Sequence, residues 1–138
     1  MKYILDASVA LKWALIEADS PRAMALRQEA RRGLHRLLAP DIFPLEIANA
    51  LTRAERKGIL QPPQAVILLA DILSTPPEFL PSLPLLPRAV ELSSQSRCGI
   101  YDCLYVAAAE EEACELVTAD EKLIRSLPRS PLILLGSL

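Results

Sequence analysis

Four acidic residues lie where an apolar segment of this chain ends or where a helical pattern begins. They are Asp6, Glu46, Asp102 and Asp120. A carboxylate is costly to bury unless it is paired or binds a cation, so acids at the rim of an apolar core require an explanation. In a chain that alternates strands and helices, the carboxyl ends of the parallel strands face one crevice, where ligands bind. Four carboxylates that converge there would suit a hard divalent cation, Mg²⁺ or Mn²⁺.

Short apolar runs alternate with helical patterns along the whole chain. We expect strands over 2–6, 37–39, 83–86, 115–118 and 132–135. We expect helices over 9–16, 20–33, 42–57, 64–73, 88–96, 102–113 and 121–127. Pro21 in the first turn of its helix and Gly58 after the end of another are favourable at those positions. The alternation predicts an α/β fold in which a short, mostly parallel central sheet is flanked by helices on both faces.

The length of 138 residues fits one domain that can bury a substantial core. Although 51% of the residues are hydrophobic, no apolar run reaches the ~18 residues that a membrane helix needs. Asp6 also interrupts any secretory signal. The three cysteines, Cys98, Cys103 and Cys114, form no CxxC pair and suit a reducing compartment, where we expect them to pack in the core. We therefore expect a cytoplasmic protein with no membrane partner.

The distribution of charge is compatible with a nucleic-acid partner. Setting aside the four candidate acids leaves 13 of the 17 acidic residues against 15 Lys and Arg, a balance of +2. Several basic residues are clustered: Arg22, Arg27, Arg31, Arg32, His35 and Arg36. The cluster could neutralise phosphates, or it could be an ordinary solvated helix face, with His35 at the surface. Because His35 is the only histidine, a histidine-rich zinc site or a Ser-His-Asp triad is not expected.

The four candidate acids come from four separate elements, so only the folded chain can bring them together. Without a cation such a group repels itself, which raises the pKa values of its members. One or two Mg²⁺ ions would balance these charges, activate a water and stabilise a leaving oxygen. That chemistry fits phosphodiester hydrolysis and needs no histidine base.

The segments around the four acids resemble the four acidic motifs of the PIN-domain nucleases. They are 5–8 (LDAS), 46–51 (EIANAL), 101–109 (YDCLYVAAA) and 116–123 (LVTADEKL). They occur in the family's order and cover nearly the whole chain, which is similar in length to the compact VapC-type toxins of toxin–antitoxin pairs. The resemblance implies a single PIN-like nuclease domain over 1–138.

The resemblance also implies an activity, a site and partners. The expected activity is that of a Mg²⁺- or Mn²⁺-dependent endoribonuclease whose four acids bind metal directly or through water. Ser8 and Thr118 would supply hydroxyls that hydrogen-bond the carboxylates or metal-bound waters. The expected partners are an RNA substrate, a small antitoxin protein that occupies the site, and a second copy of the chain in a homodimer.

Two further side chains could contact RNA. Lys12 follows the first predicted strand and could meet a phosphate. Arg53 and Asn49 lie on the same helical face as Glu46. Arg53 and Asn49 could touch substrate, or they could form an exposed polar stripe. Trp13 is expected in the core or in an interface.

Other interpretations of the acids remain open. Each acid could be a helix cap or a turn residue, which would require four separate coincidences. An aspartyl-phosphate phosphohydrolase could use Asp6 as its nucleophile, although Ser8 stands where such enzymes usually carry a second acid. The chain could also be a PIN-like binding module without activity. A phosphatase would act on small phosphoesters, whereas a nuclease would act only on polynucleotides.

Apolar side chains on two helices joined by a proline turn suggest self-association. They are Ile47, Leu51, Ile67, Leu68 and Ile72. These residues exceed what one thin sheet layer requires, so we expect the helical hairpin to form part of a two-fold dimer contact.

Overall fold

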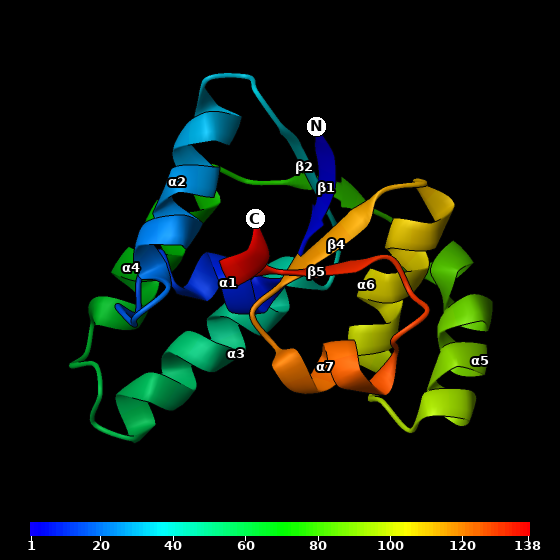
Figure 1. Cartoon of the computed structure of the whole chain (residues 1–138). Coiled ribbons are helices and arrows are strands. Elements are labelled where there is room, and N and C mark those ends of the chain that lie inside the picture. Colours follow the sequence, from blue (N-terminus) through cyan, green and yellow to red (C-terminus); the bar gives the residue numbers. More distant parts are fainter.

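A five-stranded parallel sheet forms the centre of the computed structural model, which describes all residues 1–138 (Figure 1). The strands lie in the order β3 (Glu78–Leu80), β2 (Arg36–Pro40), β1 (Lys2–Leu5), β4 (Glu115–Thr118) and β5 (Leu132–Leu134). The chain builds outward from β1 to β3 and then returns to add β4 on the opposite side of β1. The carboxyl ends of β1 and β4 therefore meet at the point where the strand order reverses, which is where open parallel sheets bind ligands.

Seven helices surround this sheet. They are α1 (Ala7–Leu11), α2 (Ser20–Arg31), α3 (Phe43–Arg56), α4 (Gln64–Leu73), α5 (Leu86–Ser96), α6 (Ile100–Glu111) and α7 (Glu121–Ser126). Figure 1 shows α2 and α4 on one side of the sheet and α5 and α6 on the other. The predicted α/β class with helices on both faces is confirmed. None of the helices combines the length and the hydropathy that crossing a bilayer requires.

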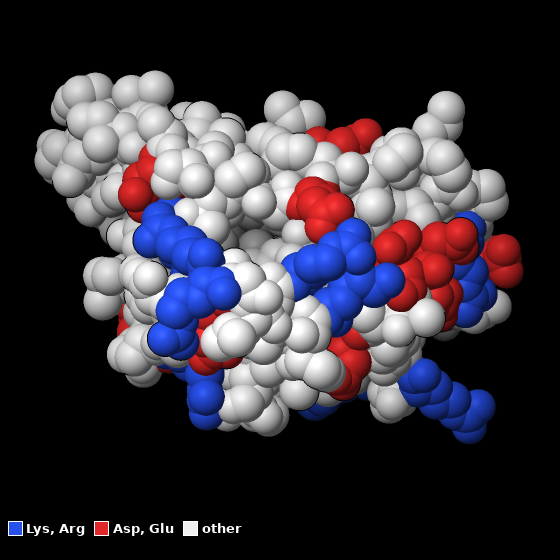
Figure 2. Space-filling model, turned by 90° about the horizontal axis from the view of Figure 1, so that it is seen from above, with Lys and Arg blue, Asp and Glu red and all other residues white.

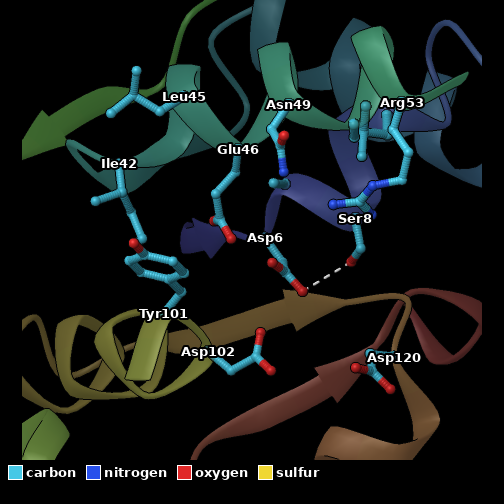
Figure 3. A pocket seen from close by; sticks show the side chains of 13 residues that line it. Asp6, Ser8, Ile42, Leu45, Glu46, Asn49, Arg53, Tyr101, Asp102 and Asp120 are labelled. Atoms are coloured by element: carbon cyan, nitrogen blue, oxygen red, sulfur yellow. Dashed lines mark hydrogen bonds between the residues drawn. The ribbon is translucent and has the colours of Figure 1, made fainter. Parts of the chain in front are cut away.

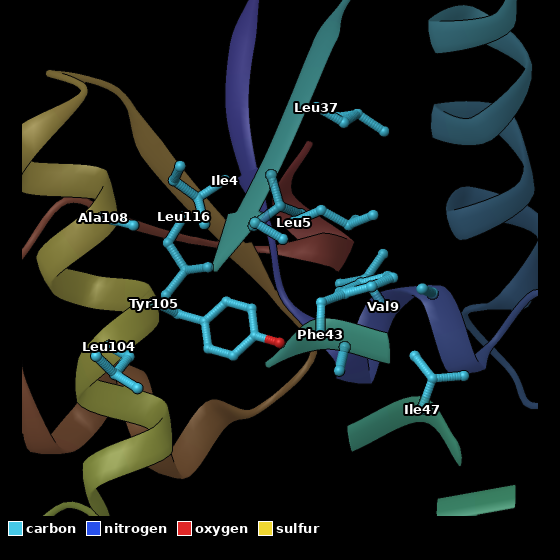
Figure 4. Close-up of a cluster of buried hydrophobic side chains, with 14 of the residues drawn as sticks. Ile4, Leu5, Val9, Leu37, Phe43, Ile47, Leu104, Tyr105, Ala108 and Leu116 are labelled. Carbon is cyan, nitrogen blue, oxygen red and sulfur yellow. The ribbon is translucent and has the colours of Figure 1, made fainter. Parts of the chain in front are cut away.

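The core lies on both faces of the two central strands (Figure 4). Ile4 and Leu5 of β1 and Leu116 of β4 are fully buried, which explains why these strands are continuous apolar runs rather than alternating ones. Phe43 from α3 packs in the same cluster. Every residue of α6 from 103 to 109 is buried, since its run of alanines leaves room for close packing on the sheet.

The predicted strand over 83–86 is wrong. The edge strand is instead Glu78–Leu80, which pairs in parallel with β2, and Leu83–Leu85 is a 3₁₀ turn that leads into α5. Pro84 and Pro87 account for the difference, because proline has no N–H for a strand ladder and its fixed φ suits the first turn of a helix. Leu83 is 77% exposed, so it is not a core strand residue.

Most predicted helices differ from the structure by one or a few residues at their ends, and two of these differences bear on the candidate residues. The helix expected over 9–16 is α1, which starts at Ala7 and stops at Leu11. Beyond it the chain turns so that Trp13 can bury its ring and donate its indole N–H to the carbonyl of Ala23 at 2.9 Å. The helix expected over 102–113 begins two residues earlier, at Ile100, which places Asp102 inside its first turn.

The predicted dimer contact is wrong for three of its five residues. Ile47, Leu51 and Ile72 are fully buried within the core of their own chain, because α3 and α4 pack together and onto the sheet. They cannot also contact a partner. Ile67 is 60% exposed and Leu68 is half-buried, so the outward apolar face of the hairpin is smaller than the sequence pattern indicated.

Candidate active site

A cavity of about 430 Å³ at the carboxyl ends of β1 and β4 contains all four candidate acids (Figure 3). Asp6 directly follows β1 and Asp120 follows β4, while Glu46 and Asp102 lie in the first turns of α3 and α6. The other lining residues are Ala7, Ser8, Leu11, Ile42, Leu45, Asn49, Ala50, Arg53 and Tyr101. Residues up to 114 positions apart in sequence thus share one small volume, which the separate helix-cap readings of the acids would not require.

Asp6 is the most buried of the four acids, and two hydroxyl groups hold its carboxylate. Its Oδ2 accepts hydrogen bonds from Ser8 Oγ at 2.8 Å and from Thr118 Oγ1 at 2.7 Å. Burial raises the pKa of Asp6, the two hydroxyls oppose that effect, and the charge of Asp120 adds to it. Oδ1 accepts no hydrogen bond and remains free to bind a ligand.

The same two hydroxyls connect Asp6 to the segment that carries Asp120. Ser8 Oγ accepts the N–H of Ala119 at 3.2 Å, and Thr118 Oγ1 accepts the N–H of Asp120 at 3.1 Å. Each hydroxyl therefore accepts a backbone N–H from residues 119–120 and donates to the carboxylate of Asp6. The network fixes how Asp6 and Asp120 lie relative to each other.

Glu46 reaches into the cavity from α3 with an oxygen that has no partner. Its Oε1 and the hydroxyl of Tyr105 are both buried and lie near each other, but their geometry falls short of a hydrogen bond. Burial raises the pKa of Glu46, the neighbouring Tyr105 hydroxyl lowers it, and the charges of Asp6 and Asp102 raise it. A buried carboxylate oxygen without a partner costs about 1–3 kcal/mol, so this atom is well suited to a cation or a water.

Asp102 enters the cavity from the first turn of α6. No hydrogen bond reaches its carboxylate, and it is only partly exposed. Burial, together with the charges of Asp6 and Asp120, raises the pKa of Asp102 to about 6. A carboxylate held in its charged form at this cost is typical of a site that binds a positive group.

Asp120 has a second role besides lining the cavity. Its Oδ1 accepts the N–H groups of Lys122 at 3.0 Å and Leu123 at 3.2 Å, which caps α7. The alternative interpretation of Asp120 was a turn residue, and the structure shows that it is a helix cap instead. Because Oδ2 takes no part in the cap, Asp120 can also offer an oxygen to the cavity.

The donor set fits Mg²⁺ or Mn²⁺. All four candidate ligands are carboxylates, no histidine or cysteine lines the cavity, and Oε1 of Glu46 is an unpaired buried oxygen. Hard divalent cations prefer oxygen ligands. No three of these side chains converge closely enough to enclose an ion by themselves. A cation here would therefore take part of its coordination from water, as Mg²⁺ usually does.

The two candidate RNA contacts differ in position. Arg53 lines the cavity and its guanidinium is exposed. Lys12 does not line it: its ammonium pairs with Glu17 and, at 2.8 Å, with Asp19. The charge of Lys12 is thus neutralised locally. The chain turns after α1 and brings these acids to Lys12, whereas the prediction had a helix continuing to residue 16.

The arginine cluster of the sequence is structural only in part, since Arg22 and Arg32 are exposed and form no ion pair. Arg27 is 3% exposed and bonds the Asp71 carboxylate at 3.1 Å and the Asp71 carbonyl at 2.6 Å, with its guanidinium 4.6 Å from the centre of the Trp13 ring. Arg36 binds both carboxylate oxygens of Glu78. Blue and red side chains lie beside one another on the face seen in Figure 2, with no broad surface of one sign. His35 is also less exposed than expected, since it bonds Glu29 at 2.6 Å.

Six cavity residues were not among the predicted site residues: Ala7, Leu11, Ile42, Leu45, Ala50 and Tyr101. Leu45 and Tyr101 directly precede Glu46 and Asp102 in the sequence. Their position next to candidate ligands at helix starts was the signal that could have identified them.

Sequence comparisons connect this arrangement with known proteins. A family model described as PIN domain matches residues 3–127. Ribonuclease VapC3 of Pyrobaculum aerophilum is 30% identical over 134 residues, which are 93% of this chain and 96% of the relative. Ribonuclease VapC12 of Mycobacterium tuberculosis is 31% identical over 124 residues, which are 89% of this chain and 90% of the relative.

Solved structures share the same fold. PAE2754 from Pyrobaculum aerophilum has a TM-score of 0.72 at 23% identity and covers 99% of this chain and 93% of its own. VapBC2 from Rickettsia felis, bound to a DNA fragment from its promoter, has a TM-score of 0.68 at 19% identity, with 97% and 98% covered. A toxin–antitoxin complex from Klebsiella pneumoniae has a TM-score of 0.65 at 14% identity, with 99% of both chains covered.

Proposed function

This chain belongs to the PIN domain family, and on that premise we propose that it is a divalent-cation-dependent endoribonuclease of the VapC toxin type. The observation that carries the proposal is the convergence of Asp6, Glu46, Asp102 and Asp120, from four separate elements, in one cavity. The relatives named as VapC ribonucleases, which match about nine-tenths of the chain, support the same reaction class.

In this proposal the four carboxylates hold Mg²⁺ or Mn²⁺. A cation held there would supply an activated water and a positive charge for the leaving oxygen of the phosphodiester. Ser8 and Thr118 keep the Asp6 carboxylate in one orientation, so that Oδ1 faces the cavity. Arg53, which is the only cationic residue in the lining, contacts a phosphate of the RNA.

The proposed partners are a small antitoxin protein and a second copy of this chain. Support for the antitoxin comes from chains of the same fold that were solved as VapBC2 or as a toxin–antitoxin complex. Support for a homodimer comes from exposed Val66 and Ile67 on α4, which leave an apolar face uncovered in the single chain. The reduced cysteines fit a cytoplasmic location.

Incubation of the purified protein with defined RNAs, in Mg²⁺, in Mn²⁺ and in excess chelator, tests the proposed reaction. We expect cleavage that requires the cation, with no hydrolysis of a small phosphoester such as p-nitrophenyl phosphate. Hydrolysis of the small ester alone would favour the aspartyl-phosphate alternative. Cleavage that persists in chelator would refute the metal-dependent mechanism, and binding without cleavage in either metal would identify an inactive module.

A further inference from the structure

The two ends of the cavity differ in chemical character (Figure 3). Tyr101 lies at one end, with Ile42 and Leu45 on the wall that faces it. Arg53 and Asn49 lie toward the opposite end. The acidic side chains lie between these ends, so a strand of RNA whose phosphate is cut at the acids must extend toward both.

The side chains at the apolar end are exposed, although the packing of the folded chain does not require them to be. Tyr101 is 59% exposed and Leu45 is 71% exposed, although both belong to helices that bury their opposite faces in the core. The Tyr101 hydroxyl makes no hydrogen bond within the protein, so neither its ring nor its polar atom serves the fold. An aromatic ring held open beside a reactive centre is suited to stacking on a planar group.

The opposite end carries a free positive charge. The guanidinium of Arg53 makes no ion pair or hydrogen bond, unlike those of Arg27, Arg36 and Arg88, and Arg53 is the only arginine in the cavity lining. An unpaired arginine at the rim of a carboxylate cavity is available for a backbone phosphate, which it can bind through two N–H groups.

We propose that Tyr101, with Ile42 and Leu45 opposite it, forms a nucleobase subsite that holds one unpaired base next to the scissile phosphate, while Arg53 holds a phosphate on the other side. The base must be unpaired, because a ring inside a cavity reaches the face of a base only when the base has left its stack. This inference rests on the proposed function and adds the part of the substrate that the site recognises.

The test compares Tyr101 variants on an RNA that the protein cuts at one position and on copies of it that lack the base of either flanking nucleotide. Tyr101→Ala should lower kcat/KM on the intact RNA about tenfold, chiefly through KM, because it removes one stacking contact. On one of the two abasic RNAs, the parent and Tyr101→Ala should be equal. Tyr101→Trp should retain activity, whereas Tyr101→Leu should not. Fluorescence anisotropy in chelator should show the same order of RNA affinities without any cleavage.

Leu83→Ala is the matched control, since Leu83 is 77% exposed on a surface outside the cavity and its loss should change nothing. An equal loss for Tyr101→Ala on the intact and on both abasic RNAs would overturn the subsite, because the ring would then support Asp102 or a protein partner instead. A parent protein that cuts no RNA at all would refute the proposed function itself. The two failures are therefore distinguishable.

Discussion

The hydroxyl group of Thr118 donates a hydrogen bond of 2.7 Å to Oδ2 of Asp6, a residue 112 positions earlier in the chain. The same hydroxyl accepts the N–H of Asp120 at 3.1 Å and is fully buried. One side chain at the end of β4 thus orients a carboxylate at the end of β1 and the backbone of another candidate ligand. The precision of the site depends on this contact between neighbouring strands.

Thr118→Val should damage both stability and activity. The change keeps the shape of the side chain but leaves the Asp120 N–H and Oδ2 of Asp6 with one partner fewer, at a cost of about 1–2 kcal/mol. RNA cleavage should fall because Asp6 is less firmly oriented. Urea denaturation in chelator measures the first effect and single-turnover cleavage the second. Thr52→Val, on the exposed face of α3, is the control; equal behaviour of the two variants would show that the Thr118 hydroxyl has no special role.

Asp6→Asn should abolish RNA cleavage and growth inhibition while the fold remains intact. The substitution removes one charged ligand but almost no volume, and the amide can still accept from Ser8 and Thr118. Asp41→Asn provides a matched control, because Asp41 bonds Ser82 and does not line the cavity. Circular dichroism checks that the fold is intact, and cleavage assays measure the loss of activity. Full activity of Asp6→Asn would exclude Asp6 from the reaction.

The stability of the metal-free protein should depend on the protonation of Asp102. The unfolded chain releases this proton near pH 3.8, whereas the folded protein retains it up to about pH 6. Between these values the folded state binds more protons, so this group makes stability fall as pH rises. Asp19 and Glu78, whose pKa values are lowered by Lys12 and Arg36, act in the opposite direction. Only a substitution isolates the share of Asp102.

Asp102→Asn should therefore raise the melting temperature in chelator near pH 7. The substitution removes a repelled charge, which should increase the free energy of unfolding by about 1 kcal/mol after allowance for screening by solvent. The increase should vanish below pH 4, where the parent carboxyl is neutral. The variant should also gain less stability from added Mn²⁺ than the parent does. A lower melting temperature in chelator, combined with an unchanged response to Mn²⁺, would contradict a shared metal site.

Ile67→Glu should weaken the proposed homodimer. Ile67 is exposed on α4, so a charge there costs the single chain little but is unfavourable inside an apolar contact. Light scattering at tens of micromolar should show a shift from dimer to monomer. Val90→Glu, on the exposed side of α5, should leave the mass unchanged. A parent protein that is strictly monomeric would rule out the dimer.

The features that could be predicted from the sequence are those with a local chemical cause. Asp6 and Asp120 follow apolar strands, and Glu46 and Asp102 lie at helix starts, so their meeting at one edge of a parallel sheet follows from the order of the elements. The strand at Glu78–Leu80 could not be predicted in this way, because an edge strand buries little and has a weak apolar pattern.

Other errors arose where tertiary contacts decide the outcome. Ile72 and Ile67 are equally apolar in the sequence, and only the packing of α4 on the body of the protein separates the buried one from the exposed one. The sequence pattern predicts that Arg27 is a charge on the surface. In the structure, the carboxylate and carbonyl of Asp71, 44 positions later, bind its guanidinium and allow it to be buried. Such long-range partners leave no trace in the local pattern.

The order of the strands also determines when, during translation, the protein can first act. β4 lies between β1 and β5, and the N–H of Asp6 donates to the carbonyl of Val117 in this strand. A nascent chain that has not yet reached residue 118 lacks the strand that borders β1, the hydroxyl that orients Asp6, and the last of the four acids. If the proposed site carries the activity, a partial chain that stops before residue 118 therefore cannot cleave RNA, however well its first strands have folded.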